Sequence, residues 1–92
     1  PAGASALMNG VLADIPAATE RLKAAWEQAK ASPGVDPTRV AAIGYCFGGS
    51  TAQVLAYEGT PLSAIASFHG SLDVPTAEQA KAVKCKMLIC HG

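Results

Sequence analysis

Positive charge is scarce in this sequence and does not exceed negative charge: among 92 residues, Lys and Arg number seven, as do Asp and Glu. The basic residues are spread along the chain, with no cluster that could follow a phosphate backbone, so nucleic acid is not expected as a partner. No apolar run approaches the roughly 20 residues that cross a bilayer, and the first residues lack the basic start of a secretion signal. We therefore expect a soluble, cytoplasmic protein with no membrane partner.

Cysteine is also sparse, and its number is odd: the chain has Cys46, Cys85 and Cys90. This pattern does not resemble a secreted disulfide framework, so reduced thiols are expected. A metal site formed by Cys85, Cys90 and His91 is not favoured, because zinc needs four converging ligands and an extended strand sends Cys90 and His91 to opposite faces. No metal site is predicted.

Apolar residues, by contrast, make up half of the chain, which allows a core without disulfides or metal. The sequence begins without Met and ends on His91-Gly92, directly after an apolar run, so both ends look cut. We therefore expect residues 1–92 to form the central part of a single domain, with further strands before it and further segments after it.

Apolar spacing divides the sequence into alternating helices and strands. Helices are predicted over residues 16–31, 50–58 and 76–83, and strands over residues 40–43, 62–68 and 87–90. Trp26 lies on the apolar face of the first helix and is predicted to be in the core. Pro37 marks a turn over residues 36–39, and the continuous apolar run Val40–Ile43 is typical of a strand buried on both faces. The alternation predicts an α/β fold with a parallel sheet and right-handed crossovers.

Cys46 lies in the sequence Gly44-Tyr45-Cys46-Phe47-Gly48-Gly49, between a predicted strand and a predicted helix. This is the setting of a nucleophile elbow, a strained turn that presents a Ser or Cys at the carboxyl edge of a sheet. Gly44 and Gly48 would relieve crowding on either side of Cys46. The following helix would favour the thiolate, and the Phe47 N–H would face an oxyanion. A buried structural cysteine is the competing interpretation, but the strand before and the helix after favour a reactive thiol.

The residues around this motif resemble the dienelactone hydrolase family. Val35-Asp36-Pro37-Thr38-Arg39-Val40 leads into Ile43–Gly49 as a VDP-x-R-(I/V) turn leads into a G-(Y/F)-C-(F/L)-G-G elbow in that family. Phe68-His69-Gly70 and Met87–Gly92 resemble the ends of its next two strands. The resemblance covers the chain from about Pro16 to its end.

The resemblance implies part of an α/β-hydrolase fold, a three-layer α/β/α arrangement with a parallel sheet of about three strands. It implies that Cys46 is the nucleophile, that Phe47 supplies an oxyanion N–H, and that Gly44, Gly48 and Gly49 shape the elbow. The reaction would be hydrolysis of a small-molecule ester or lactone through a thioester, which needs no cofactor. The resemblance also implies that the catalytic acid, the catalytic His and a second oxyanion N–H lie outside residues 1–92.

Two histidines and two carboxylates are further candidates. His69 ends the strand next to that of Cys46, so it is a candidate for the substrate rim, although a structural His bonded to backbone is the favoured interpretation. His91 has the analogous place one strand further on. Asp73 and Glu78 come after Cys46 in the sequence, as a catalytic carboxylate would. Helix capping and solvation explain these two residues better.

Two alternatives to a hydrolase stay open at this stage. In one, the stretch is a catalytically incomplete piece whose exposed sheet edges are covered by self-association. In the other, the reactive thiol of Cys46 serves redox or scavenging chemistry and is only oxidised or alkylated.

Overall fold

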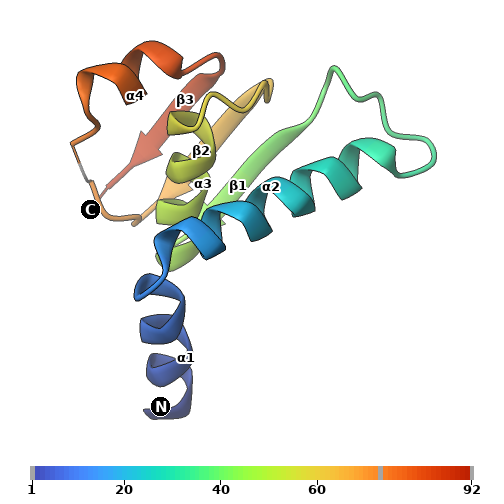
Figure 1. Ribbon diagram of the computed structural model, residues 1–92. Helices are drawn as coiled ribbons and strands as arrows, with labels where there is room; N and C mark the ends of the chain where they lie inside the picture. Colours follow the sequence, from blue (N-terminus) through green and yellow to red (C-terminus); the bar gives the residue numbers. More distant parts are fainter. Residues whose placement is uncertain (1, 73, 92) are drawn as a thin grey trace.

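The computed structural model describes residues 2–72 and 74–91. Helices and strands follow in the order α1 (Ala2–Leu12), α2 (Ile15–Ala31), β1 (Ala41–Tyr45), α3 (Phe47–Tyr57), β2 (Ala64–Phe68), α4 (Ala77–Ala82) and β3 (Lys86–Cys90) (Figure 1). The strands form one parallel sheet in the order β1-β2-β3. The predicted α/β fold with three parallel strands is confirmed.

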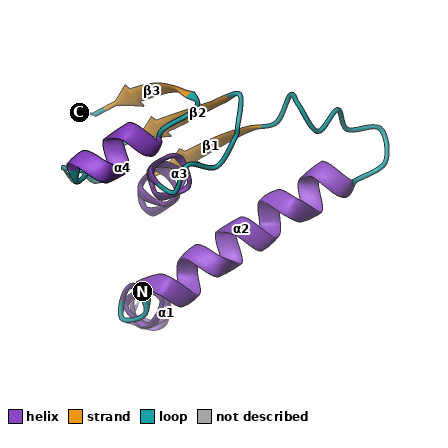
Figure 2. Ribbon diagram, turned by 45° about the horizontal axis from the view of Figure 1, so that its top comes forward, coloured by secondary structure: helices purple, strands orange, loops and turns teal. Residues whose placement is uncertain are grey.

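All the helices that pack near the sheet lie on the same side of it (Figure 2). Parallel crossovers are right-handed in nearly all proteins, so strands added in one direction place α3 and α4 on one face. Helix α2 packs beside α3 on that side. The described residues therefore supply the sheet and one helical layer, and the second helical layer of the expected three-layer arrangement is not formed by them.

The opposite face of the sheet is open. Side chains alternate along a strand, so Ile43, Tyr45 and Leu88 all point to this face, and Ile43 is 64% and Tyr45 66% exposed. The prediction that Val40–Ile43 is buried on both faces is therefore wrong for these residues, because both crossovers cover the same side. A shallow apolar hollow of about 290 Å³ runs over the open face of the three strands.

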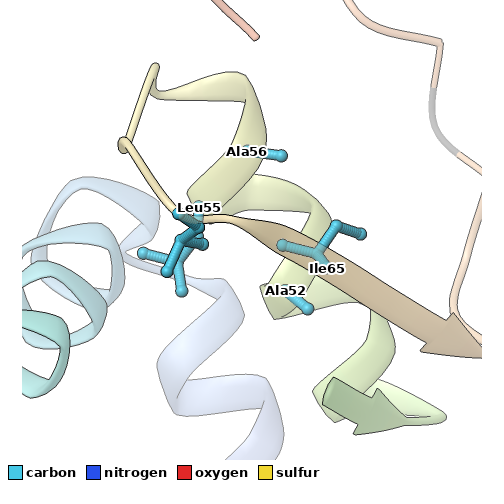
Figure 3. Packing of buried hydrophobic residues seen from close by; sticks show 5 residues of the cluster. Ala52, Leu55, Ala56 and Ile65 are labelled. Atoms are coloured by element: carbon cyan, nitrogen blue, oxygen red, sulfur yellow. The ribbon is translucent and has the colours of Figure 1, made fainter. Parts of the chain in front are cut away.

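Helix α3 forms the centre of the core. Ala52, Leu55 and Ala56 of this helix form a buried cluster with Ile65 of β2 (Figure 3), and Leu62 completes it. Leu22 and Trp26 of α2 are partly buried and pack against this cluster, so Trp26 lies beside the core that was predicted to contain it. The turn at Cys46 thus directly precedes the most deeply packed helix of the structure.

Three differences from the sequence prediction have local reasons. Helix α1 was not predicted. Its sequence has good helix formers, but it lacks the polar face of an amphipathic helix, and Leu7 is exposed. Helix α3 begins at Phe47 rather than Ser50, since Gly48 and Gly49 lower helix propensity but do not prevent a helix that packing stabilises. Helix α2 begins at Ile15, after Asp14, whose carboxylate accepts a 3.1 Å hydrogen bond from the Ala17 N–H.

Candidate active site at the carboxyl edge of the sheet

Cys46 is the single residue between β1 and α3, and its backbone is left-handed, with φ 53° and ψ −119°. Such a conformation costs a non-glycine residue roughly 1–3 kcal/mol and persists only where its surroundings enforce it. Two hydrogen bonds hold the turn: the Cys46 N–H donates to the Phe68 carbonyl at 2.8 Å, and the Ser50 N–H donates to the Cys46 carbonyl at 3.2 Å. The side chain of Cys46 is exposed. This is the geometry of a strained strand-turn-helix elbow.

Gly44 and Gly49 permit the close approach of backbone in this turn. A Cβ at Gly44 would overlap the carbonyl group of Gly48 and lie 2.6 Å from the Gly49 nitrogen, so α3 can fold back over β1 only with glycine there. A Cβ at Gly49 would lie 2.6 Å from Ser67 Oγ of β2. The prediction that a side chain at Gly48 would be crowded is wrong, because a Cβ there would meet nothing within 4 Å. Gly48 lies in the first turn of α3, and its Cβ would point into open space.

Phe47 is the first residue of α3. Intrahelical hydrogen bonds do not use the first N–H groups of a helix, so its amide is available to an oxygen atom held near Cys46. Phe47 is partly buried and, with Leu22 and Val54, lines a hollow of about 110 Å³ between α2 and α3. The side chain therefore contributes to packing, and the backbone faces the edge that carries the thiol.

His69 follows β2 as Cys46 follows β1. Tyr45 and Phe68 are partners in the parallel register, so the next residues, Cys46 and His69, are neighbours at the carboxyl edge. His69 is exposed, and its φ of 59° makes it the other non-glycine residue with a left-handed backbone in the described part of the chain. Its N–H donates to the Cys90 carbonyl at 2.8 Å. Two strained residues thus lie side by side at one edge of the sheet.

His91 lies at the same edge, after β3. Its Nδ1 is 3.2 Å from the Gly70 carbonyl oxygen, a contact that becomes a hydrogen bond when Nδ1 carries the proton. The contact between imidazole and backbone that is expected of a structural histidine is therefore made by His91.

The other two cysteines have different surroundings from Cys46. Cys85 is partly buried beside the core, and this burial raises the pKa of its thiol. Cys90 is exposed but lies within β3. Exposure alone therefore does not distinguish Cys46 from Cys90; the turn and the adjoining helix do. Over residues 2–72 and 74–91, no three His, Cys, Asp or Glu side chains converge as metal ligands would.

The turn before β1 is fixed by Asp36. Its Oδ1 accepts hydrogen bonds from the Thr38 N–H at 2.9 Å and from the Thr38 hydroxyl at 2.6 Å. Both bonds lower the pKa of the Asp36 carboxyl, and the bond from the Thr38 hydroxyl has the larger effect. The Arg39 N–H donates to the Asp36 carbonyl at 3.0 Å and closes the turn. The predicted turn over residues 36–39 is confirmed.

Glu78 is the one candidate carboxylate that lies within the described residues. Glu78 is exposed in the first turn of α4, where the helix dipole favours a negative charge, in agreement with the prediction of a solvated residue. Asp73 lies outside the described residues.

Two pairs near the thiol were not found from the sequence. The rings of Tyr45 and Phe68 stack on the open face, with centroids 5.1 Å apart and planes 18° apart. The side chains of Gln53 and Ser67 form a buried hydrogen bond between α3 and β2. Aromatic residues directly before Cys46 and His69 were a usable signal for the first pair, because both end a predicted strand.

Comparisons with known proteins identify a family and similar solved structures. Residues 1–92 match the model of the dienelactone hydrolase family. The chain is similar to the crystal structure of a dienelactone hydrolase-like promiscuous phosphotriesterase, P91, from metagenomic libraries, with 42% identity over 96% of this chain and 37% of that chain and a TM-score of 0.86. A solved structure described as m3DLH has 42% identity over 92% of this chain and 35% of its own, with a TM-score of 0.83.

The chain therefore spans slightly more than a third of the length of these two structures. A search of curated proteins gave no match. None of the helices described here is long and apolar enough to cross a membrane.

Proposed function

Because the chain belongs to the dienelactone hydrolase family, we propose that Cys46 is the nucleophile of an enzyme that hydrolyses a small-molecule ester or lactone. The observation that carries this proposal is the backbone of Cys46, a non-glycine residue held at φ 53° between a strand and a helix with its thiol exposed. Strain of this kind is typical of functional sites, since a purely structural cysteine has no need of it.

The proposed reaction has two steps. In the first, the Cys46 sulfur attacks the carbonyl carbon, a C–S bond forms, and the carbonyl oxygen becomes an oxyanion near the Phe47 N–H. Collapse of this intermediate breaks the C–O bond, and the alkoxide leaves with a proton. In the second step, water attacks the thioester carbon, the C–S bond breaks, and the carboxylic acid and the free thiol are released.

Proton transfer in both steps requires a general acid–base, which typically contributes about 10²–10⁴ in rate. We propose that a His and an Asp outside residues 1–92 supply this acid–base. Residues 1–92 would then form the central, nucleophile-bearing part of one hydrolase domain. In this proposal His69 lies at the rim where the substrate binds, because it follows β2, the strand that pairs with the strand before Cys46. No cofactor enters this chemistry.

The test is to trap the acyl-enzyme in the full-length protein with p-nitrophenyl acetate and to locate the acetyl group by peptide mass spectrometry. We expect acetylation of Cys46 and sustained release of p-nitrophenol, and loss of both in Cys46→Ala. Cys90→Ala is the matched control, because it removes another exposed thiol that does not lie on the elbow. Turnover that survives Cys46→Ala contradicts the proposal.

A second candidate reaction is the hydrolysis of phosphotriesters. Its support is the 42% identity with the promiscuous phosphotriesterase over 96% of this chain. Cys46 would attack phosphorus, an S–P bond would form as the aryloxide leaves, and water would then cleave the S–P bond. Diethyl p-nitrophenyl phosphate, tested beside p-nitrophenyl acetate on the same variants, distinguishes the two substrate classes.

Redox or scavenging chemistry at Cys46 is an outcome of the same experiment. A single stoichiometric modification of Cys46 without turnover supports a reactive thiol that is not a catalyst. In either case the three free cysteines are consistent with a reducing compartment, and we propose a cytoplasmic location. The open sheet face and the two edge strands support contact with other segments of the same protein or with a second copy of it. We propose neither nucleic acid nor a membrane as a partner.

A further inference from the structure

A buried polar pair joins helix α3 to strand β2 close to the elbow. The side-chain amide of Gln53 donates a 3.0 Å hydrogen bond to the hydroxyl oxygen of Ser67. Gln53 is 2% exposed and Ser67 is fully buried, so this bond lies in the interior between α3 and β2. Burying two polar groups here contributes little net stability compared with two apolar side chains of the same shape.

The surroundings of this pair explain what it does. Gly49 and Gly70 pack so closely on Ser67 that a Cβ at either position would lie 2.6 or 2.5 Å from its hydroxyl oxygen. Contacts between such small groups bring α3 onto β2, but hydrophobic contact is non-directional and lets one element slide along the other. A hydrogen bond is strong only near one distance and angle, so the Gln53 amide holds α3 at one position along β2.

That position determines where the thiol lies. Cys46 precedes α3 directly, and its N–H donates to the carbonyl of Phe68, the residue after Ser67. A second link at this junction is the Ser71 N–H, which donates to Ser50 Oγ at 2.8 Å. A shift of α3 along β2 therefore stretches the Cys46–Phe68 bond and changes the spacing between Cys46 and His69.

We propose that Gln53 and Ser67 are positioning residues that set the placement of the Cys46 thiol. This inference rests on the proposed function, in which Cys46 is the nucleophile. Neither side chain touches substrate; they act through the backbone of α3 and β2. A misplacement of about 1 Å at a reacting atom can lower a catalytic rate about 10²-fold.

The test is the double variant Gln53→Leu/Ser67→Ala in the full-length protein. Both polar groups are removed together, so no buried amide is left unpaired and the fold is retained. The matched control is Ser63→Ala, which removes a hydroxyl that donates to the Thr38 carbonyl at 3.2 Å near the opposite end of β2. For each protein, kcat and KM with p-nitrophenyl acetate, the thermal midpoint, and the ratio of iodoacetamide labelling at Cys46 to that at Cys90 are measured.

We expect the double variant to keep its thermal midpoint and its KM, to lose roughly 10- to 100-fold in kcat, and to lose the labelling advantage of Cys46. Ser63→Ala should match the wild type in all four measurements. An unchanged kcat in a folded double variant overturns the proposal, as does an equal loss of kcat in Ser63→Ala. If the double variant does not fold, Ser67→Ala alone is held to the same criteria.

The labelling ratio separates this proposal from the proposed function. A wild-type protein that hydrolyses no ester contradicts the hydrolase, while a labelling advantage of Cys46 that disappears in the double variant still supports positioning. A wild-type hydrolase whose kcat and labelling ratio do not change in the double variant contradicts positioning alone.

Discussion

The backbone N–H of Cys46 donates a 2.8 Å hydrogen bond to the carbonyl oxygen of Phe68, the last residue of β2. The turn at Cys46 is therefore bonded to the neighbouring strand β2 and is not held by β1 alone. His69, which also has a left-handed backbone, follows the acceptor of this bond. The two strained residues lie on either side of one hydrogen bond, so a movement of β2 moves both.

Brief labelling of the native protein with iodoacetamide should modify Cys46 fastest, Cys90 more slowly and Cys85 most slowly. Cys46 is exposed on a turn at the positive end of a helix, whereas burial raises the pKa of Cys85 and so lowers its thiolate fraction at pH 7. Peptide mapping by mass spectrometry measures the three rates. The same protein unfolded in urea is the control. Equal labelling rates of the three cysteines in the native protein would contradict an activating elbow at Cys46.

Gly44→Ala and Gly48→Ala form a matched pair, because each adds one methyl group two residues from Cys46. Gly44→Ala should lower the free energy of unfolding by about 1–3 kcal/mol or more, since its Cβ overlaps the Gly48 carbonyl. Gly48→Ala should leave it unchanged or raise it by up to about 1 kcal/mol, since its Cβ is in open space within a helix. Urea denaturation decides between them, and equal losses would contradict the geometry described for Gly48.

Asp36→Ala should lower the thermal midpoint at neutral pH, and the difference from the wild type should shrink in acid. The Thr38 hydroxyl and amide hold the pKa of folded Asp36 below 3.8, so its contribution is fully present above the unfolded value and disappears as the pH falls through the folded value. Thermal scans between pH 7 and pH 2 measure this. Thr38→Ala keeps only the backbone bond, and a midpoint difference for Asp36→Ala that does not change with pH would contradict the assignment.

A protein made of these 92 residues alone should self-associate and should turn over no ester beyond one stoichiometric burst. Ile43 and Leu88 expose apolar surface on the open sheet face, and β1 and β3 are both edges of the described sheet. Ile43→Lys/Leu88→Lys should shift size-exclusion elution with light scattering toward the monomer. Val74→Lys is the control, since Val74 is an exposed apolar residue outside the sheet. A wild-type stable monomer would be incompatible with this prediction.

The sequence predicted the parts of the site that depend on neighbouring residues. The apolar run ending at Ile43, the glycine at Gly44 and the helical pattern after Ser50 are local signals, and together they located the turn at Cys46. The open space at Gly48 was missed, because the direction of its Cβ depends on where α3 begins.

Features that depend on the arrangement of whole elements were not accessible in this way. The exposure of Ile43 follows from both crossover helices lying on one face, which requires the strand order. The Gln53–Ser67 bond joins residues of different elements, 14 positions apart, and requires the register of α3 on β2. The sequence of helix α1 has no charged residue and no amphipathic pattern, and the contact of α1 with α2 could not be predicted from it.

The sequential strand order also bears on how the thiol site is assembled during folding. Ala41 pairs with Ala64, and Ala64 with Lys86, so each strand pairing closes a loop of little more than 20 residues. Contacts of such short sequence separation form early, because little chain entropy is lost in closing the loop. The bond from Cys46 to Phe68 needs only β1, α3 and β2, so the elbow can form before β3 joins the sheet.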